Sequence, residues 1–138
     1  GRIGLTVQDP TAPHESRVLL RQAIAQAGLD TQRLRSHGVH ALTDDALRAL
    51  FETAGFIGYR SELRTLVETH GSVDELLDWS ESSAFGNFLD GFTHAERKRV
   101  RDAFTELVET KRTPEGLRLA RYLRYAFARK PAQPVSGT

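Results

Sequence analysis

Apolar and polar residues alternate at the start of the chain. Ile3, Leu5 and Val7 are separated by small or polar residues, which is the two-residue period of a β-strand. The next residues, 9–13, include two prolines, and proline cannot continue a strand ladder. We therefore predict a first strand over residues 2–8.

Helical spacing of apolar residues follows this strand. Residues 14–27 carry apolar side chains on neighbouring rows, and Gly28 is placed as a C-terminal stop. A second helix is predicted from the cap Thr43, with two acidic residues in its first turn, up to Gly55. The residues between these two helices are predicted to form a loop.

Two sequence signatures of a capping box predict further helix starts. The pairs are Ser72 with Glu75 and Thr93 with Glu96, each a hydroxyl residue followed three positions later by a glutamate. Between the two helices, residues 85–89 are predicted to form a short helix. The helix that begins at Thr93 is predicted to be the longest, and its apolar stripe consists of Val100, Ala103, Phe104, Leu107 and Val108.

Two more strands complete the pattern. Residues 56–67 form the second predicted strand, and residues 119–129 form the last one, after a turn at 113–116. Alternating strands and helices predict an α/β fold in which helices cover a sheet. The last strand is best placed antiparallel between the other two. In that arrangement one side of the first strand offers unpaired backbone groups to another chain.

Composition limits the possible classes of function. The 138 residues include 19 basic and 18 acidic side chains and no cysteine. The resulting net charge of +1 gives no general attraction to nucleic acid or anionic lipid. Disulfides and thiolate chemistry are excluded, and no apolar run is long enough to span a membrane. We expect a cytoplasmic protein, and the excess of arginine over lysine suggests a GC-rich bacterial source.

Taken in order, these segments resemble the C-terminal portion of class I S-adenosylmethionine-dependent methyltransferases of the ubiquinone, menaquinone and biotin pathways. Residues 1–7 resemble the fifth strand of that family, residues 42–56 its last crossover helix, and residues 122–130 its reversed seventh strand. The resemblance implies a Rossmann-like sheet of about three strands, the last antiparallel, with a helical segment that covers the substrate. It also implies that S-adenosylmethionine binds to a different part of the parent enzyme, because the chain contains no glycine-rich nucleotide loop.

The same resemblance suggests how the chain is organised. Residues 1–130 would form a single methyltransferase-like region, made of a strand-helix-helix-strand part (1–70), a helical lid (71–112) and a closing strand (113–130), with a flexible tail at 131–138. The chain would then be a fragment, inactive alone, whose partners are a small organic substrate and a missing N-terminal half. The alternative is a non-enzymatic binding or assembly module that pairs with a second copy through the exposed first strand.

The residues just after the first strand are candidates for the site. Open α/β sheets bind ligands beyond the carboxyl ends of their strands, so Gln8 and Asp9 are predicted to contact substrate. His14 is predicted as a general base, since imidazole titrates near neutral pH. The alternatives are turn chemistry for Asp9 and an exposed position in the first turn of a helix for His14.

An aromatic segment is the candidate lid. Methyl transfer requires an apolar pocket that excludes water. The segment offers three large rings and one polar amide for substrate binding, from Trp79, Phe85, Asn87 and Phe88. The alternative is that these rings pack in the core.

Two further clusters have simpler explanations. His37 and His40 have no third ligand at suitable spacing, so no metal site is predicted. The basic run at 97–101 could meet an acidic carrier protein, a phosphate-bearing substrate or nucleic acid, but its position around a helix predicts a solvated face. We therefore predict no metal, no membrane partner and no nucleic-acid partner.

Overall fold

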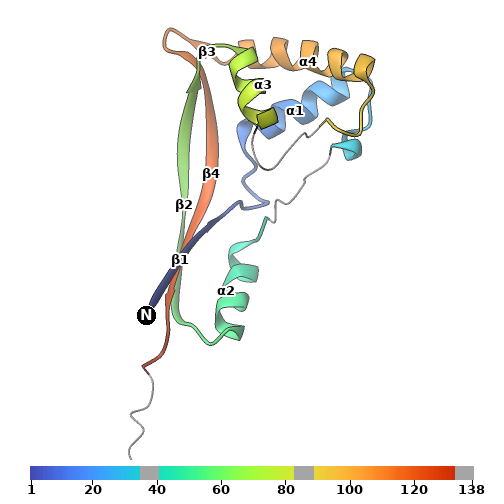
Figure 1. The fold of residues 1–138 in the computed structure, drawn as a ribbon. Helices are drawn as coiled ribbons and strands as arrows, with labels where there is room; N and C mark the ends of the chain where they lie inside the picture. The colour runs from blue at the N-terminus through green and yellow to red at the C-terminus, as the bar shows by residue number, and fades with distance from the viewer. Residues whose placement is uncertain (35–40, 83–88, 133–138) are drawn as a thin grey trace, which may run out of the picture. The chain divides into compact units, whose positions relative to one another are not determined.

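A computed structural model of the chain describes residues 1–34, 41–82 and 89–132. The chain is α/β, as predicted from the sequence, and Figure 1 shows its elements. No helix in these ranges is long and apolar enough to cross a membrane. The elements are β1 (Arg2–Val7), α1 (Glu15–Gln26), the 3-10 helix η1 (Thr31–Arg33), α2 (Asp44–Thr53), β2 (Ile57–His70), α3 (Val73–Ser82), α4 (His94–Glu109), β3 (Arg112–Thr113) and β4 (Gly116–Arg129).

The strands form an antiparallel sheet in the order β1-β4-β2, and the short β3 pairs with the start of β4. In the β1–β4 ladder Ile3 lies opposite Ala128, and Leu5 lies opposite Ala126. The predicted placement of the last strand between the other two is confirmed. Both long strands exceed their predicted ranges, because β2 continues to His70 and β4 begins at Gly116.

The chain divides into two compact units, and β2 and β4 contribute residues to both. The first unit contains residues 1–12, 40–65 and 122–138, and the second contains residues 13–39 and 66–121. Each unit has its own apolar core.

In the first unit α2 packs against one face of the sheet, beside β1 and β4 (Figure 1). The buried core residues are Leu47 and Phe51 of α2 and Ala126 and Ala128 of β4. Residues 3, 5 and 7 of β1 are partly buried against them, which confirms the alternation predicted for this strand. The predicted cap of α2 also forms, since the hydroxyl of Thr43 accepts a hydrogen bond from the backbone N–H of Ala46 at 3.1 Å.

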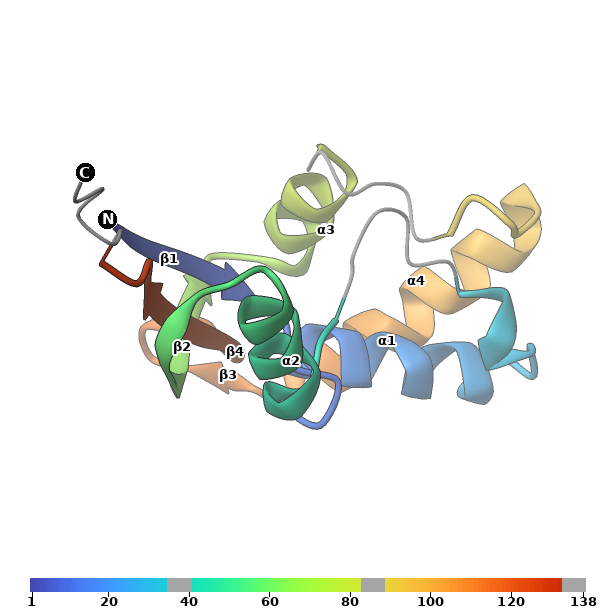
Figure 2. The same cartoon turned by 90° about the horizontal axis from the view of Figure 1, so that it is seen from below.

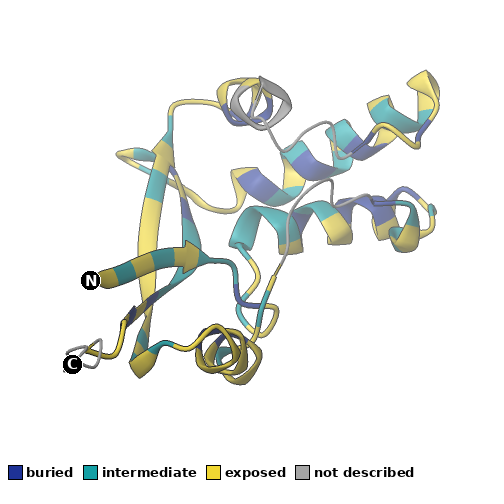
Figure 3. Ribbon diagram, turned by 60° about the horizontal axis from the view of Figure 1, so that its bottom comes forward, coloured by how far each residue is buried: buried dark blue, intermediate teal, exposed yellow. Residues whose placement is uncertain are grey.

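In the second unit α1 and α4 lie side by side (Figure 2). Their buried residues appear in dark blue in Figure 3. The stripe predicted for α4 is confirmed, because Val100, Phe104 and Val108 are buried and Ala103 and Leu107 pack against the same core. This core also contains buried residues of α1, α3 and the first part of β4, namely Leu19, Ala23, Ile24, Leu76, Leu77, Leu117 and Leu119.

The two predicted capping boxes differ in the structure. At α4 the box is complete: the N–H of Glu96 donates to Thr93 Oγ1 at 3.2 Å, and the N–H of Thr93 donates to Glu96 Oε1 at 2.9 Å. At α3 the hydroxyl of Ser72 accepts from the N–H of Glu75, but the Glu75 carboxylate accepts from the N–H of Gly71 at 2.8 Å. For α3 the prediction was therefore partly wrong: the backbone N–H that donates to the Glu75 carboxylate is that of Gly71, one residue before the predicted donor Ser72.

Candidate functional site

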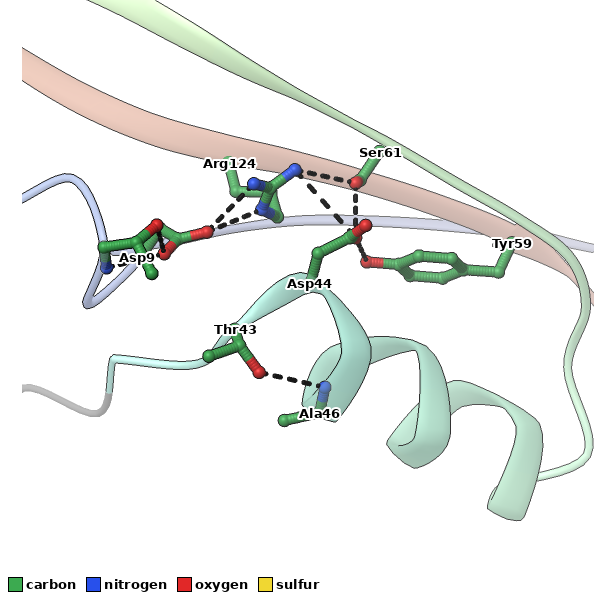
Figure 4. Close-up of polar contacts among 8 residues, drawn as sticks. Asp9, Thr43, Asp44, Ala46, Tyr59, Ser61 and Arg124 are labelled. Atoms are coloured by element: carbon green, nitrogen blue, oxygen red, sulfur yellow. Dashed lines mark hydrogen bonds and ion pairs between the residues drawn. The ribbon is translucent and has the colours of Figure 1, made fainter.

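The carboxyl end of β1 carries a buried carboxylate, Asp9, which is 4% exposed. Arg124 of β4 donates to its Oδ2 from Nε at 3.0 Å and from Nη2 at 2.9 Å (Figure 4). Its other oxygen, Oδ1, accepts from the backbone N–H of Thr11 at 2.8 Å and from the Thr11 hydroxyl at 2.6 Å. Both oxygens of Asp9 are therefore engaged within the first unit.

A second carboxylate, Asp44, lies at the N-terminus of α2. Its Oδ1 accepts from the hydroxyl of Ser61 at 2.6 Å and from the hydroxyl of Tyr59 at 2.8 Å, both on β2. Arg124 Nη1 donates to Ser61 Oγ at 3.0 Å and lies 3.9 Å from Asp44 Oδ1. The polar clamp formed by Asp9, Asp44, Tyr59, Ser61 and Arg124 thus ties the end of β1 to α2, β2 and β4 (Figure 4).

The clamp shifts the ionisation of its members in the directions that its contacts require. Burial alone would raise the pKa of Asp9, but the hydrogen bonds from Thr11 and Arg124 outweigh it, so the pKa of Asp9 lies below its ordinary value. Hydrogen bonds from Ser61 and then Tyr59 lower the pKa of Asp44. Burial, followed by the hydrogen bond to Asp44, raises the pKa of Tyr59.

These contacts describe a structural role for the clamp. Asp9 accepts from the Arg124 guanidinium and from Thr11, and Asp44 accepts from the Tyr59 and Ser61 hydroxyls, so a substrate atom would have to displace an existing hydrogen bond. The Asp9–Thr11 bonds are the turn chemistry that the sequence offered as the alternative for Asp9. Contact of Asp9 with a substrate stays a prediction.

Gln8 contributes its backbone at the same end of β1. Its carbonyl accepts a hydrogen bond from the N–H of Leu42 at 3.0 Å, and Gln8 forms a parallel bridge with Ala41. The side chain of Gln8 is half-buried. Its predicted contact with substrate also stays a prediction.

His14 belongs to the second unit, whereas Gln8 and Asp9 belong to the first. It occupies the N-cap position of α1 without a side-chain cap bond, and it is half-buried rather than exposed. Burial lowers the pKa of His14, the positive charge of Arg121 lowers it further, and Glu68 acts in the opposite direction. A neutral imidazole is the form that a general base needs, so these surroundings suit the predicted role.

The charged residues near His14 form their own set of contacts. Arg121 Nη1 and Glu68 Oε1 are 2.6 Å apart, and Glu68 Oε2 lies 3.5 Å from Nε2 of His70. In the described ranges no group of three or more His, Asp or Glu residues is arranged to hold a metal ion.

The predicted aromatic lid falls mostly outside what the structure describes. The backbone of Trp79 lies in α3, but its side chain lies outside the described part of the chain. Phe85, Asn87 and Phe88 lie outside the described residues as well, and so do His37 and His40. The lid stays a prediction.

Sequence reasoning missed an arrangement on the first-unit sheet. Four arginines and two aromatic rings lie on the face opposite α2, and we call them the arginine face: Arg2, Arg60, Arg64, Tyr125, Phe127 and Arg129. Their alternate spacing within β2 and β4 was visible in the sequence. Only the strand register brings the six side chains together.

No protein-family model and no curated protein matches the chain. Function is therefore inferred from the fold and from the contacts of the described residues.

Proposed function

We propose that the chain forms the C-terminal, substrate-side part of an S-adenosylmethionine-dependent methyltransferase acting on a small organic molecule. The observation that carries the proposal is the strand order, in which β4 lies between β1 and β2 and is antiparallel to β1. The resemblance implies this arrangement for a reversed closing strand. The helix α2 lies between β1 and β2 in the chain, where the crossover helix is expected.

The outer edge of β1 supports the proposal. The N–H of Lys130 donates to the carbonyl of Gly1 at 2.8 Å, which fixes the odd residues of β1 as those bonded to β4. The backbone groups of Arg2, Gly4 and Thr6 consequently point away from β4, where a further strand could add. Further along the same edge Gln8 already pairs in parallel with Ala41.

The donor molecule would bind outside this chain. The residues after β1 form a turn around Asp9 rather than a glycine-rich loop, and the clamp holds both carboxylate oxygens of Asp9. When bound to the rest of the enzyme, S-adenosylmethionine would supply the methyl group. Within this chain, His14 would accept a proton from the substrate group that becomes methylated.

The test is to express the complete reading frame that encodes residues 1–138 and to titrate its product with S-adenosylmethionine by calorimetry. We expect that protein to bind the donor molecule, and residues 1–138 alone not to bind it. In the longer protein, His14→Gln should lower kcat with little change in the affinity for S-adenosylmethionine. A reading frame without a cofactor-binding segment, or a product that does not bind the donor molecule, would overturn the proposal.

The same edge of β1 favours a second candidate function, assembly with another copy of the chain. Thr6→Pro removes one outward N–H and keeps the ladder to β4, whereas Thr6→Val keeps the N–H. If copies pair through this edge, light scattering will show a dimer for the parent chain and for Thr6→Val, and a folded monomer for Thr6→Pro. A parent chain that is monomeric at all concentrations rules this function out.

A further inference from the structure

The first-unit sheet has two chemically different faces. Side chains alternate between the faces of a strand. Ile3, Leu5, Ala126 and Ala128 pack in the core with α2, so their sequence neighbours on β1 and β4 lie on the opposite face. Those neighbours are mainly arginines, aromatic residues and glycine rather than aliphatic residues. This face therefore has the composition of a solvated surface.

The arginines and rings of this face contact one another across the strands. The Arg60 guanidinium lies 5.4 Å from the ring centroid of Phe127, and that of Arg64 lies 4.7 Å from the ring centroid of Tyr125. Arg2 and Arg129 are directly opposite in the β1–β4 ladder. Three strands thus bring cations and π-systems together on the arginine face.

Two glycines leave room for these side chains. A Cβ at Gly4 would lie 3.2 Å from Phe127 Cδ1, and a Cβ at Gly58, where φ is +66°, would lie 3.4 Å from Arg129 Nε. A hollow of about 440 Å³ lies next to Phe127 and Arg129, and Arg60 lines it as well. Phe127 remains 37% exposed, so part of its ring is available to a ligand.

The charge of this face is strongly positive although the chain as a whole is nearly neutral. Among the described side chains of the face, four are arginines and one, Glu62, is acidic; Glu62 is ion-paired with Arg64. Arg60 and Arg64 lie four residues apart on one strand, a distance of roughly 13 Å at the usual rise. The positive charge therefore extends along the strand beyond the length of a single phosphate.

We propose that the arginine face binds single-stranded nucleic acid, in contrast to the expectation of no nucleic-acid partner that the net charge and the basic run at 97–101 gave. Guanidinium groups match phosphate oxygens with two parallel hydrogen bonds, and the exposed part of the Phe127 ring gives an unpaired base a surface on which to stack. A duplex buries its base faces and would offer the exposed part of Phe127 no base to stack on. An acidic peptide would match the charge, but its carboxylates do not stack on the negative face of an aromatic ring. The inference does not rest on the proposed methyltransferase function, because it concerns the other face of the sheet.

The charge contribution can be tested with residues 1–138 and a fluorescein-labelled 12-nucleotide poly(U) RNA, followed by anisotropy over a salt titration. In the double variant Arg60→Gln/Arg129→Gln, we expect affinity at low salt to fall by about tenfold or more. The slope of log affinity against log salt should become shallower by about 1.4, as expected for two lost phosphate contacts. The matched control is Arg21→Gln/Arg118→Gln, which removes the same charge from exposed positions of the second unit and should change affinity by less than about twofold.

The ring contribution is tested separately by Phe127→Leu, which keeps an apolar side chain at the same place. Loss of base stacking should weaken binding by about 5- to 100-fold, while thermal melting shows that the variant is folded. The proposal is overturned if the parent chain does not bind the RNA at low salt, or if the control variant loses as much affinity as the arginine-face variant. Equal affinity for duplex RNA or for poly-glutamate would also overturn it.

Discussion

Arg124 places Nε and Nη2 at 3.0 and 2.9 Å from the same carboxylate oxygen of Asp9. The Asp9 side chain is 3% exposed and that of Arg124 is 15% exposed, so the pair is largely removed from water. A buried carboxylate is tolerated when its charge is paired and its lone pairs accept hydrogen bonds, and Thr11 supplies the remaining donors. The pair fixes the end of β1 to the middle of the sheet.

Replacing Arg124 with leucine should therefore destabilise the protein strongly. The variant leaves Asp9 buried without its counter-charge, and we expect the free energy of unfolding to fall by about 3 kcal/mol. Urea denaturation followed by circular dichroism measures this change. Arg118→Leu is the control, since its ion pair with Glu115 is exposed and 3.5 Å long, and it should cost less than about 1 kcal/mol. Equal losses in the two variants would show that the clamp does not stabilise the fold.

Local signals predicted the elements of this fold well. The alternation of Ile3, Leu5 and Val7 and the caps at Thr43 and Thr93 depend on residues close together in sequence, and the structure confirms them. The clamp and the arginine face depend on strand register. Arg124 meets a residue 115 positions away, and no local pattern specifies that partner.

The limits of β2 were missed for a related reason. Most of this strand is exposed, and its ribbon is mainly yellow in Figure 3. Its exposed apolar residues include Leu63, Leu66 and Val67. A strand held by backbone pairing at the edge of a sheet shows no clear alternation of buried and exposed side chains. The polar residues at 68–70 therefore gave no sign that the strand continues.

The surroundings of His14 predict a measurable shift. Burial and the charge of Arg121 lower the pKa of His14, so its imidazole should titrate below the ordinary value of about 6.5 in an NMR titration. Because the folded-state pKa is the lower one, this group favours folding at neutral pH. Its contribution is lost as the pH falls below the unfolded value.

The variant Arg121→Gln tests whether the charge of Arg121 contributes to the lowered pKa of His14. It removes the repelling charge and leaves that of Glu68 close by, so the pKa of His14 should rise. Arg118 takes no part in these contacts, so the control variant Arg118→Gln should leave the pKa of His14 unchanged. A pKa of His14 that is the same in the parent chain and in Arg121→Gln would show that Arg121 does not influence it.

Glu96 should titrate far below other glutamates. Arg33 donates to its two carboxylate oxygens at 2.7 and 2.9 Å, and the backbone N–H of Thr93 donates to Oε1. These bonds, led by those from Arg33, lower the pKa of Glu96 to about 2. The associated stability is present above the unfolded pKa of about 4.3 and is lost as the pH falls toward 2. Carbon-detected NMR of the side-chain carboxyl should show this value and a clear rise toward 4 in Arg33→Gln; an ordinary pKa in the parent chain would contradict the contact.

Gly116 and Gly55 offer a test of backbone geometry at two turns. Both have positive φ, +119° and +85°, which side chains disfavour. At Gly116 a Cβ would also lie 2.7 Å from the carbonyl oxygen of His70, whereas at Gly55 nothing lies within 4 Å. Gly55→Ala should cost about 1 kcal/mol from backbone strain alone. Gly116→Ala should cost about 3 kcal/mol, since the start of β4 must also move away from the end of β2. Urea denaturation compares the two variants, and similar losses would mean that the end of β2 and the start of β4 do not approach as closely as the structure places them.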